Sequence, residues 1–262
     1  MKQETKILIV EDETITAMEI ENSLIGAGYQ VIGPVSSHQD ALKMVRMERP
    51  GLILMDIKLK GESDGIQTAE AIRKIHDIPI IYLTAFSDIS TLARAIDTNP
   101  YNFIAKPFNE NDLKAAVMIA LNNYNHARQV RENENWLTSV LNSMGEAIVT
   151  TDQNGRFRWM NTLAEDLTGY QQDEVDQIHI DQICQFLRMD QSEQMIYPCT
   201  DILRSDEKNL MHEKVLLRTS RMPETPVRIR GNPVLGPDES VIGCVLMFQV
   251  VKDGPSGPKE SG

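Results

Sequence analysis

The stretch LILMD at residues 52–56 decides the fold of the first half of the chain. A short, continuous apolar run of this kind is typical of a strand that is buried on both faces of a parallel sheet. The run ends on Asp56, and open α/β sheets bind their ligands at the carboxyl ends of their strands. We therefore expect Asp56 to lie at the functional edge of such a sheet.

Three other apolar runs in the first half also end on polar side chains. These runs are ILIV at 7–10 before Glu11, Asp12 and Glu13, IIYL at 80–83 before Thr84 and Ala85, and FIA at 103–105 before Lys106, Pro107 and Phe108. If the four runs lie parallel in one sheet, three carboxylates, a hydroxyl and an ammonium group meet at one edge.

Helical patterns separate these strands. Apolar residues recur at helical spacing over 15–24, 41–47, 65–75 and 89–96, and each stretch is followed by Gly or Pro. A short strand at 31–32 and a fifth helix after residue 108 complete the series. Strict alternation of five strands and five helices predicts a doubly wound α/β domain with a five-stranded parallel sheet, similar to the flavodoxin fold.

The fifth helix is expected to continue beyond this domain. Asn109 can cap its first turn, and apolar residues follow at helical spacing as far as Tyr124. Residues 125–135 are polar but contain no Gly or Pro, and apolar positions resume at Leu137. We expect one continuous connecting helix with short coiled-coil segments at its ends; a solvated helical linker is the alternative.

The second half of the chain has the pattern of antiparallel strands. Alternating runs at 147–152 and 156–161 flank Asn154 and Gly155, and an Asn-Gly pair between such runs is a strong hairpin signal. Helical and irregular segments are expected over 162–209. Further strand patterns lie at 214–218, 227–233 and 241–251. These features predict an α+β domain with a five-stranded antiparallel sheet.

Composition argues against several classes of protein. The net charge of −12 argues against a large nucleic-acid-binding face, and 41% hydrophobic residues without a long apolar run argue against a membrane span. Cys184, Cys199 and Cys244 are far apart and form no CxxC pair, so we expect core or surface thiols rather than a zinc site or a disulfide framework. A strand almost at the N-terminus leaves no signal peptide, so we expect a cytoplasmic protein.

Both halves resemble known families. The first resembles the receiver domain of two-component response regulators, through ILIVED at 7–12, LILMD at 52–56, Gly65, LTA at 83–85 and FIAKPF at 103–108. The second resembles a PAS domain, through AIVTTD at 147–152, the Asn154-Gly155 turn, WMN at 159–161, LTGY at 167–170 and VLMFQVV at 245–251. The expected organisation is a receiver at 1–123, a helical linker at 124–135, a PAS domain at 136–252 and a flexible tail at 253–262.

The receiver resemblance implies a phosphorylation site. Asp56 would be the phosphoacceptor, with Thr84 and Lys106 contacting the phosphoryl oxygens. The ligands implied for Mg²⁺ are Glu11, Asp12, Asp56 and the backbone carbonyl of Lys58. Thr84 and Phe103 would form the conformational switch, although an aromatic residue on an inner strand also suits a purely structural place in the core.

The PAS half leaves its ligand, if any, unidentified. None of the three cysteines has the Asn-Cys-Arg context of flavin photoreceptors, and His179 and His212, the histidines available to a haem, are expected at the surface. Candidate pocket-lining residues are Met160, Phe186, Leu187, Leu216 and Met247, with plain core positions as the alternative.

The sequence therefore predicts a response regulator of a two-component phosphorelay. It would accept a phosphoryl group from a histidine kinase or a phosphotransfer protein and relay its state through the helix to the PAS domain and a downstream signalling protein. We expect a homodimer with no direct contact to nucleic acid or membrane. No helix-turn-helix or kinase motif is found, so we expect no enzymatic activity beyond phosphotransfer to Asp56 and slow self-dephosphorylation.

Two alternatives are left open. One is a ligand-sensing PAS module in which the receiver serves as a dimerisation scaffold. The other is a phosphohydrolase with an aspartyl-phosphate intermediate; in haloacid-dehalogenase-like enzymes a second acid lies two residues after the nucleophile, and here Lys58 occupies that position.

Overall fold

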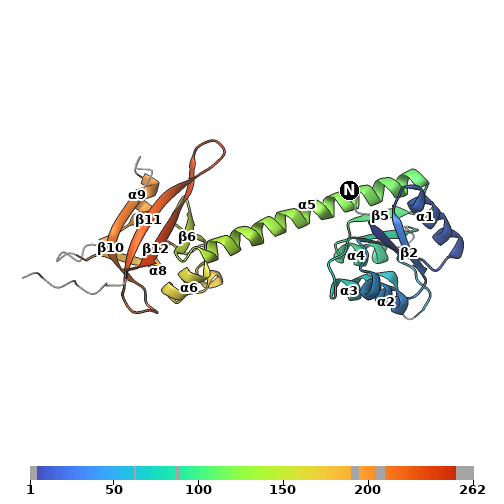
Figure 1. The fold of residues 1–262 in the computed structure, drawn as a ribbon, viewed down its shortest axis with the longest axis horizontal. Coiled ribbons are helices and arrows are strands. Elements are labelled where there is room, and N and C mark those ends of the chain that lie inside the picture. The colour runs from blue at the N-terminus through green and yellow to red at the C-terminus, as the bar shows by residue number, and fades with distance from the viewer. Residues whose placement is uncertain (1–4, 62, 86–88, 190–194, 205–209, 252–262) are drawn as a thin grey trace, which may run out of the picture. The chain divides into compact units, whose positions relative to one another are not determined.

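The computed structural model describes residues 5–61, 63–85, 89–189, 195–204 and 210–251. The chain divides into two compact units, Met1–Glu132 and Asn133–Gly262 (Figure 1). The tail expected at 253–262 lies outside the described residues.

The first unit alternates strands and helices. Its elements are β1 (Lys6–Val10), α1 (Thr14–Gly26), β2 (Gln30–Val35), α2 (His38–Glu48), β3 (Leu52–Asp56), α3 (Gly65–Arg73), β4 (Ile80–Thr84), α4 (Ile89–Asp97), β5 (Asn102–Ala105) and α5 (Glu110–Ser143). The strands form one sheet in the order β2-β1-β3-β4-β5, and every neighbouring pair is parallel. The predicted doubly wound, five-stranded parallel sheet is confirmed.

Each face of this sheet packs against its own helices. Side chains alternate between the two faces along a strand. Leu8 and Ile53 therefore join the buried side chains of α2 and α3, whereas Ile7 and Leu54 join those of α1 and α5. Since both faces are filled with apolar side chains, polar groups are accommodated at the ends of the strands.

Helix α5 is continuous over 34 residues, as the sequence predicts. It begins with a capped turn, in which the Asp112 backbone N–H donates to Asn109 Oδ1 at 2.9 Å. Leu113, Val117 and Ala120 are buried against the parallel sheet, whereas every residue over 125–140 is exposed. Within this stretch Arg131 Nη2 donates to the Asp77 carboxylate at 2.8 Å.

The second unit is built on an antiparallel sheet. Its elements are β6 (Ala147–Asp152), β7 (Phe157–Met160), α6 (Thr162–Thr168), α7 (Gln172–Val175), α8 (Ile180–Ile183), β8 (Gln185–Arg188), β9 (Met195–Ile196), α9 (Pro198–Arg204), β10 (Leu210–Arg218), β11 (Thr225–Leu235) and β12 (Val241–Val250). The strand order is β7-β6-β12-β11-β10-β8-β9, and neighbouring strands are antiparallel.

The predicted count of five strands in this sheet is corrected by the structure. All five expected strands form, but β8 and β9 extend the sheet to seven within the described residues. Both lie in the segment expected to be helical or irregular. Four residues in β8 and two in β9 are too few for a clear alternating pattern. Pairing with β10, which places Leu187 opposite Leu216, makes β8 a strand.

The predicted hairpin joins β6 to β7. Gly155 has a φ of 74°, a left-handed conformation that favours glycine. The Asp152 carboxylate accepts hydrogen bonds from the backbone N–H groups of Asn154 (2.8 Å) and Arg156 (2.9 Å). The Asn-Gly signal therefore identifies this turn correctly.

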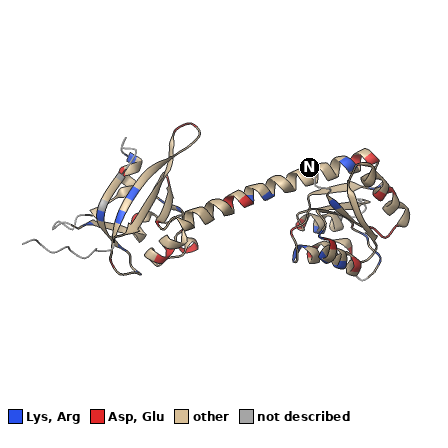
Figure 2. Cartoon of the chain, in the orientation of Figure 1, with Lys and Arg blue, Asp and Glu red and all other residues tan. Residues whose placement is uncertain are grey.

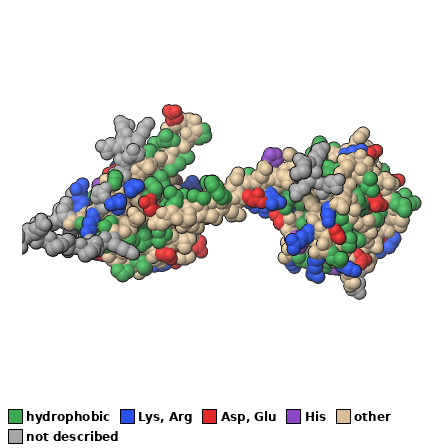
Figure 3. Space-filling model, in the orientation of Figure 1, with side chains coloured by type: hydrophobic (Ala, Val, Ile, Leu, Met, Phe, Trp, Pro, Cys, Tyr) green, Lys and Arg blue, Asp and Glu red, His purple; other side chains and the backbone are tan. Residues whose placement is uncertain are grey.

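The helices of the second unit cover one face of its sheet. Val227 and Ile229 on β11 and Phe248 on β12 are fully buried in a core that includes side chains of α6, α7, α8 and α9. By alternation Arg228 and Arg230 lie on the other face. Figure 2 marks Lys and Arg positions in blue along the strands of this sheet. On the face seen in Figure 3, basic and acidic side chains are interspersed over both units.

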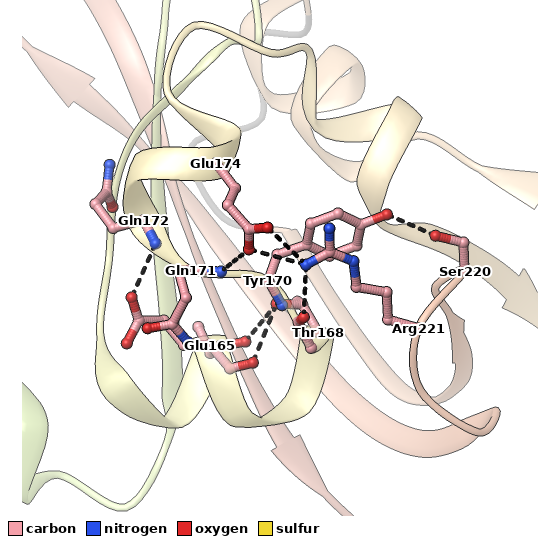
Figure 4. A network of polar contacts seen from close by, with 10 residues as sticks. Glu165, Thr168, Tyr170, Gln171, Gln172, Glu174, Ser220 and Arg221 are labelled. Atoms are coloured by element: carbon pink, nitrogen blue, oxygen red, sulfur yellow. Dashed lines mark hydrogen bonds and ion pairs between the residues drawn. The ribbon is translucent and has the colours of Figure 1, made fainter.

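A polar network fastens the loop between β10 and β11 to the helical layer (Figure 4). The Arg221 guanidinium lies 3.9 Å from the centre of the Tyr170 ring, and its Nη1 donates to both carboxylate oxygens of Glu174 and to the Gly169 carbonyl. Gly169 has a φ of 76°, and a Cβ there would lie 2.8 Å from Arg221 Cβ. A glycine at this position thus allows the arginine to approach.

Candidate functional site

The carboxyl ends of the parallel strands bring the predicted acidic residues together. Strands β1 and β3 are in register with Val10 beside Met55, so Glu11 and Asp56 follow as neighbours. Carboxylate oxygens of Glu11, Asp12 and Asp56 lie within 4.8 Å of one another. Among the described residues, these three side chains form a group of potential metal ligands.

Lys106 links two of these carboxylates from the end of β5. Its Nζ donates to Glu11 Oε2 at 2.6 Å and to Asp56 Oδ2 at 2.7 Å. Burial alone would lower the pKa of Lys106, but its hydrogen bonds to Asp56 and Glu11 outweigh burial and raise the pKa above its usual value. The ammonium group therefore stays charged at the edge of the sheet.

Glu11 is a buried acid of this cluster with a raised pKa. Its side chain is fully buried, and burial raises its pKa to about 7. The hydrogen bond from Lys106 opposes this shift, while the negative charge of Asp56 adds to it. Bringing the carboxylates together therefore costs free energy, because they lose water and repel one another. One lysine offsets only part of this cost.

This donor set fits a hard divalent cation. Three carboxylates face one bridging ammonium group, and Lys60, 3.3 Å from Asp12, has a side chain that is 85% exposed and is therefore well screened. Mg²⁺ is bound through one or two carboxylates with several waters and backbone oxygens. Asp56 Oδ1 also accepts the Lys58 backbone N–H at 3.0 Å, which holds the Lys58 backbone beside the carboxylate. An acidic pocket consistent with Mg²⁺ binding is therefore present.

A pocket of about 140 Å³ opens beside Asp56. The polar and small residues that line it are Asp56, Lys58, Thr84, Ala85, Thr91 and Lys106. Thr84 ends β4 opposite Ala105 on β5, which places its hydroxyl at the same edge as Lys106. Thr91 on α4 was missed by the sequence reasoning, because nothing in its local pattern marks it. The predicted phosphoryl-contacting residues Thr84 and Lys106 thus share one pocket with Asp56.

Gly65 has a steric role behind the pocket. A Cβ at this position would lie 1.9 Å from the Asp56 carbonyl oxygen. The absence of a side chain lets the start of α3 approach the end of β3, where the Gly65 N–H donates to the Ile57 carbonyl at 3.0 Å. The glycine therefore fixes the backbone that carries Asp56.

The predicted switch residue Phe103 lies outside the lining of this pocket. Its half-buried ring stacks on Tyr82, with ring centres 5.7 Å apart. The Tyr82 hydroxyl in turn bonds Thr98 Oγ1 at 2.9 Å near the end of α4. Tyr82 was not singled out in the sequence because it is part of the apolar run at 80–83. The structure places Phe103 in contact with the core, and its switching role stays a prediction.

The candidate pocket-lining residues of the second unit are divided between the two faces of the sheet. Met160 and Phe186 are buried in the core beneath the helices. Leu216 and Met247 are half-buried, and each lies between two core residues along its strand, so its side chain is on the opposite face of the sheet. His179 is partly exposed and its Nδ1 accepts the Asp181 N–H at 3.3 Å. These residues are therefore not gathered around one cavity.

Comparison with known families assigns both units. The family model of the response regulator receiver domain matches residues 7–118, and that of the PAS fold matches residues 137–251. The chain is a response regulator receiver domain followed by a PAS domain. A receiver domain implies a histidine kinase as partner, and the two models include no enzymatic domain.

Curated relatives resemble the receiver half. The transcriptional regulatory protein PdtaR of Mycobacterium tuberculosis is 33% identical over 119 residues, which cover 45% of this chain and 58% of the relative. The phyllosphere-induced regulator PhyR of Methylorubrum extorquens is 36% identical over 118 residues, covering 45% of this chain and 43% of the relative. The chain thus spans about half the length of the curated relatives it matches.

Solved receiver structures also match. The N-terminal domain of a response regulator/sensory box/GGDEF three-domain protein from Carboxydothermus hydrogenoformans is 36% identical, with a TM-score of 0.44, over 47% of this chain and 98% of that one.

Within the described residues, no helix is both long and apolar enough to cross a membrane.

Proposed function

We propose that this chain is the response regulator of a two-component phosphorelay, with Asp56 as the phosphoacceptor. The observation that carries the proposal is the convergence of three carboxylates, two of them bonded to Lys106, beside a pocket that Asp56 and Lys106 line. The domain limits we propose are a receiver at 1–123, a helical linker at 124–135 and a PAS domain at 136–252.

Asp56 is the nucleophile in this proposal. One of its carboxylate oxygens attacks the phosphorus atom of a phosphohistidine, the P–N bond breaks, and an acyl phosphate forms on Asp56. Lys106, which donates to Asp56 Oδ2 at 2.7 Å, is positioned to neutralise a phosphoryl oxygen, and Thr84 to donate its hydroxyl to another. Ala85 leaves room for the incoming group.

Mg²⁺ is the cofactor that this donor set suits. Asp12, Asp56 and the backbone carbonyl of Lys58 would hold it, and Glu11 would act from the buried side of the cluster. When bound, the ion supplies the positive charge that offsets carboxylate repulsion and the charge of the phosphoryl group. The protein's own contribution is to keep these oxygens gathered before the reaction.

The phosphorylated state would be relayed by a change in conformational population. A phosphoryl group adds about −1.5 to −2 charges. Thr84 would move toward it, Phe103 would turn into the vacated space, and α5 would carry the change toward the PAS domain. The PAS domain would then act on a downstream signalling protein in the cytoplasm, without direct contact to nucleic acid or membrane.

Helix α5 supports a homodimer. Val130 and Leu137 in α5, and Met144 directly after its last residue, are spaced seven residues apart and are 56%, 52% and 54% exposed. Val140, 38% exposed, lies between the last two. Exposed apolar side chains seven residues apart on a helix, here Val130 and Leu137, are typical of one strand of a coiled coil, and a second copy of α5 would pack against them.

Intact-mass measurement tests the phosphoacceptor. The full chain is incubated with Mg²⁺ and acetyl phosphate, and we expect one added phosphoryl group in the wild type and in Asp97→Asn, which changes an exposed aspartate at the end of α4. Asp56→Asn should gain none. A wild type that binds Mg²⁺ but gains no mass, or an Asp56→Asn variant that gains it, would contradict the proposal.

A further inference from the structure

A cluster of reactive side chains lies in the core of the PAS domain, in the unit without the carboxylate pocket. Cys199 on α9 and Cys244 on β12 are both free thiols, with sulfur atoms 3.0 Å apart. Thr151 Oγ1 on β6 lies 3.3 Å from the first sulfur and 3.2 Å from the second. Since a disulfide bond measures about 2.05 Å, a shift of roughly 1 Å would join the two sulfurs.

Two glycines bring these elements close enough for contact. A Cβ at Gly231 on β11 would lie 2.3 Å from the Ile202 side chain of α9, and a Cβ at Gly243 on β12 would lie 2.0 Å from the Thr151 carbonyl oxygen. The first glycine lets α9 pack directly on the sheet, and the second lets β12 approach β6. The sulfur contact is therefore set by the packing of the fold and not by a mobile surface loop.

The two thiols are chemically unequal. The Thr151 hydroxyl donates to the Asp152 carbonyl at 3.0 Å, so its oxygen can accept a thiol proton, while Cys244 donates to Cys199. This hydrogen bond from Cys244 lowers the pKa of Cys199. Donating the bond, together with burial, raises the pKa of Cys244. Cys199 is thus the better nucleophile, and Cys244 is placed to react second.

We propose that Cys199 and Cys244 form a reversible thiol redox site that hydrogen peroxide converts into a disulfide. The Cys199 thiolate attacks one peroxide oxygen, hydroxide leaves, and a sulfenic acid forms. Cys244 then attacks the Cys199 sulfur and the sulfenic oxygen leaves as water, giving the S–S bond. In total two thiols and one peroxide give one disulfide and two waters, and a dithiol reductant reverses the change.

Burial sets the expected rate and effect. Cys199 is 1% and Cys244 0% exposed, so peroxide reaches them when the seven-residue helix α9 opens locally, and the reaction is slower than at an exposed thiol. The disulfide would link residues 45 positions apart. A loop of that size constrains the unfolded chain enough to raise the Tm of the PAS unit by about 10 °C.

Counting free thiols tests the site. The full chain is treated with hydrogen peroxide, quenched, denatured and labelled with N-ethylmaleimide, and the adducts are counted by intact mass. We expect three labels on the reduced wild type, one after peroxide, and three again after dithiothreitol. Cys184→Ser removes a buried cysteine outside the pair. This variant should carry two labels when reduced and none after peroxide. Cys199→Ser should keep both of its labels.

Two results would overturn the proposal. One is a peroxide-treated wild type that still carries three labels after an incubation longer than the time in which the backbone amides of α9 exchange their hydrogens. The other is an equal loss of labels in Cys199→Ser, which would mean that oxidation does not depend on the pair. The label count of the wild type requires no variant to fold. Because Asp56 is not involved, the outcome is also independent of the phosphoacceptor test.

Discussion

Among the described residues, the receiver buries acidic side chains and the PAS domain does not. In the receiver, buried Glu11 and Asp56 are ionisable and both accept a hydrogen bond from Lys106, beside a pocket that Asp56 lines. In the described part of the PAS domain, the buried polar side chains are neutral: Thr151, Asn161 and Thr168. Asn161 makes four hydrogen bonds at 2.9–3.2 Å, all to backbone groups.

This difference separates a binding site from a structural one. The Asn161 amide is satisfied by the protein itself, so nothing further is needed at that position. The acidic cluster has one bridging ammonium for three carboxylates, and an incompletely balanced buried charge is costly unless a ligand completes it. The predictions below set variants of the two kinds of site against each other.

Replacing Lys106 by Met should have the largest effect. Phosphorylation by acetyl phosphate should slow about 100-fold, the usual effect of removing a charge that stabilises a transition state. Mg²⁺ should bind at least as tightly as in the wild type, because the ammonium group that competes for Glu11 and Asp56 is gone. Phosphorylation rates and calorimetric Mg²⁺ titration measure the two effects.

The matched control is Lys60→Met, which removes an exposed ammonium group 3.3 Å from Asp12. Its phosphorylation rate should change no more than about twofold, since exposed ion pairs contribute little. Equal slowing in both variants would show that Lys106 acts only through overall charge.

Gly65→Ala should disturb the receiver through the backbone. The new Cβ would meet the Asp56 carbonyl oxygen at 1.9 Å, so the strand end must shift, at a cost of about 2–3 kcal/mol in unfolding free energy. Urea denaturation measures this loss. Gly26→Ala, whose Cβ would have no neighbour within 4 Å, should leave stability within about 1 kcal/mol of the wild type. A stable Gly65→Ala variant with normal phosphorylation would contradict the steric role.

Asn161→Ala tests the structural side of the comparison. It removes the cap of α6 and leaves the Ile148 N–H and the Leu141 and Glu146 carbonyls without this partner, so we expect a loss of about 2 kcal/mol in stability. Phosphorylation of Asp56 should be unchanged. Exposed Asn154 provides the control, and Asn154→Ala should cost no more than about 0.5 kcal/mol. A slower phosphorylation in Asn161→Ala alone would mean that the two sites are coupled.

Arg221→Lys should have the smallest effect. Lysine keeps the charge but loses the planar group that lies over Tyr170 and bonds both oxygens of Glu174 (Figure 4). The Tm should fall by about 2 °C or less, and amide hydrogen exchange should speed up over residues 219–224. Arg218→Lys, which changes another exposed ion pair with Glu224, is the control. No difference in exchange between the two variants would contradict a specific clamp.

The receiver site could be predicted from the sequence because its residues are fixed by topology. In a parallel sheet the carboxyl ends of all strands lie at the same edge. Once the strands are identified, the residues at these ends are therefore expected to lie close together, as Glu11, Asp56, Thr84 and Lys106 do. Thr91 escaped prediction because it approaches the pocket from α4, where helix packing and not a strand end decides its position.

The PAS domain was predictable in outline but not in its contacts. The Asn154-Gly155 turn and the long strands carry local signals, whereas β8 depends on pairing with β10. Cys199 and Cys244 are 45 residues apart in the sequence and meet because α9 folds onto the sheet. The sequence predicted core or surface thiols, and all three are free and buried. Their contact was not predicted, since no sequence pattern records a contact made by helix packing.

Locating the phosphoryl group is the most direct test of the central claim. The full chain is phosphorylated with acetyl phosphate and Mg²⁺, the acyl phosphate is reduced with sodium borohydride, and the peptides are sequenced by mass spectrometry. The account predicts that the residue at position 56, and no other, is converted from aspartate to homoserine. Homoserine at another acidic position, or an intact Asp56 in protein that has gained the phosphoryl mass, would contradict it.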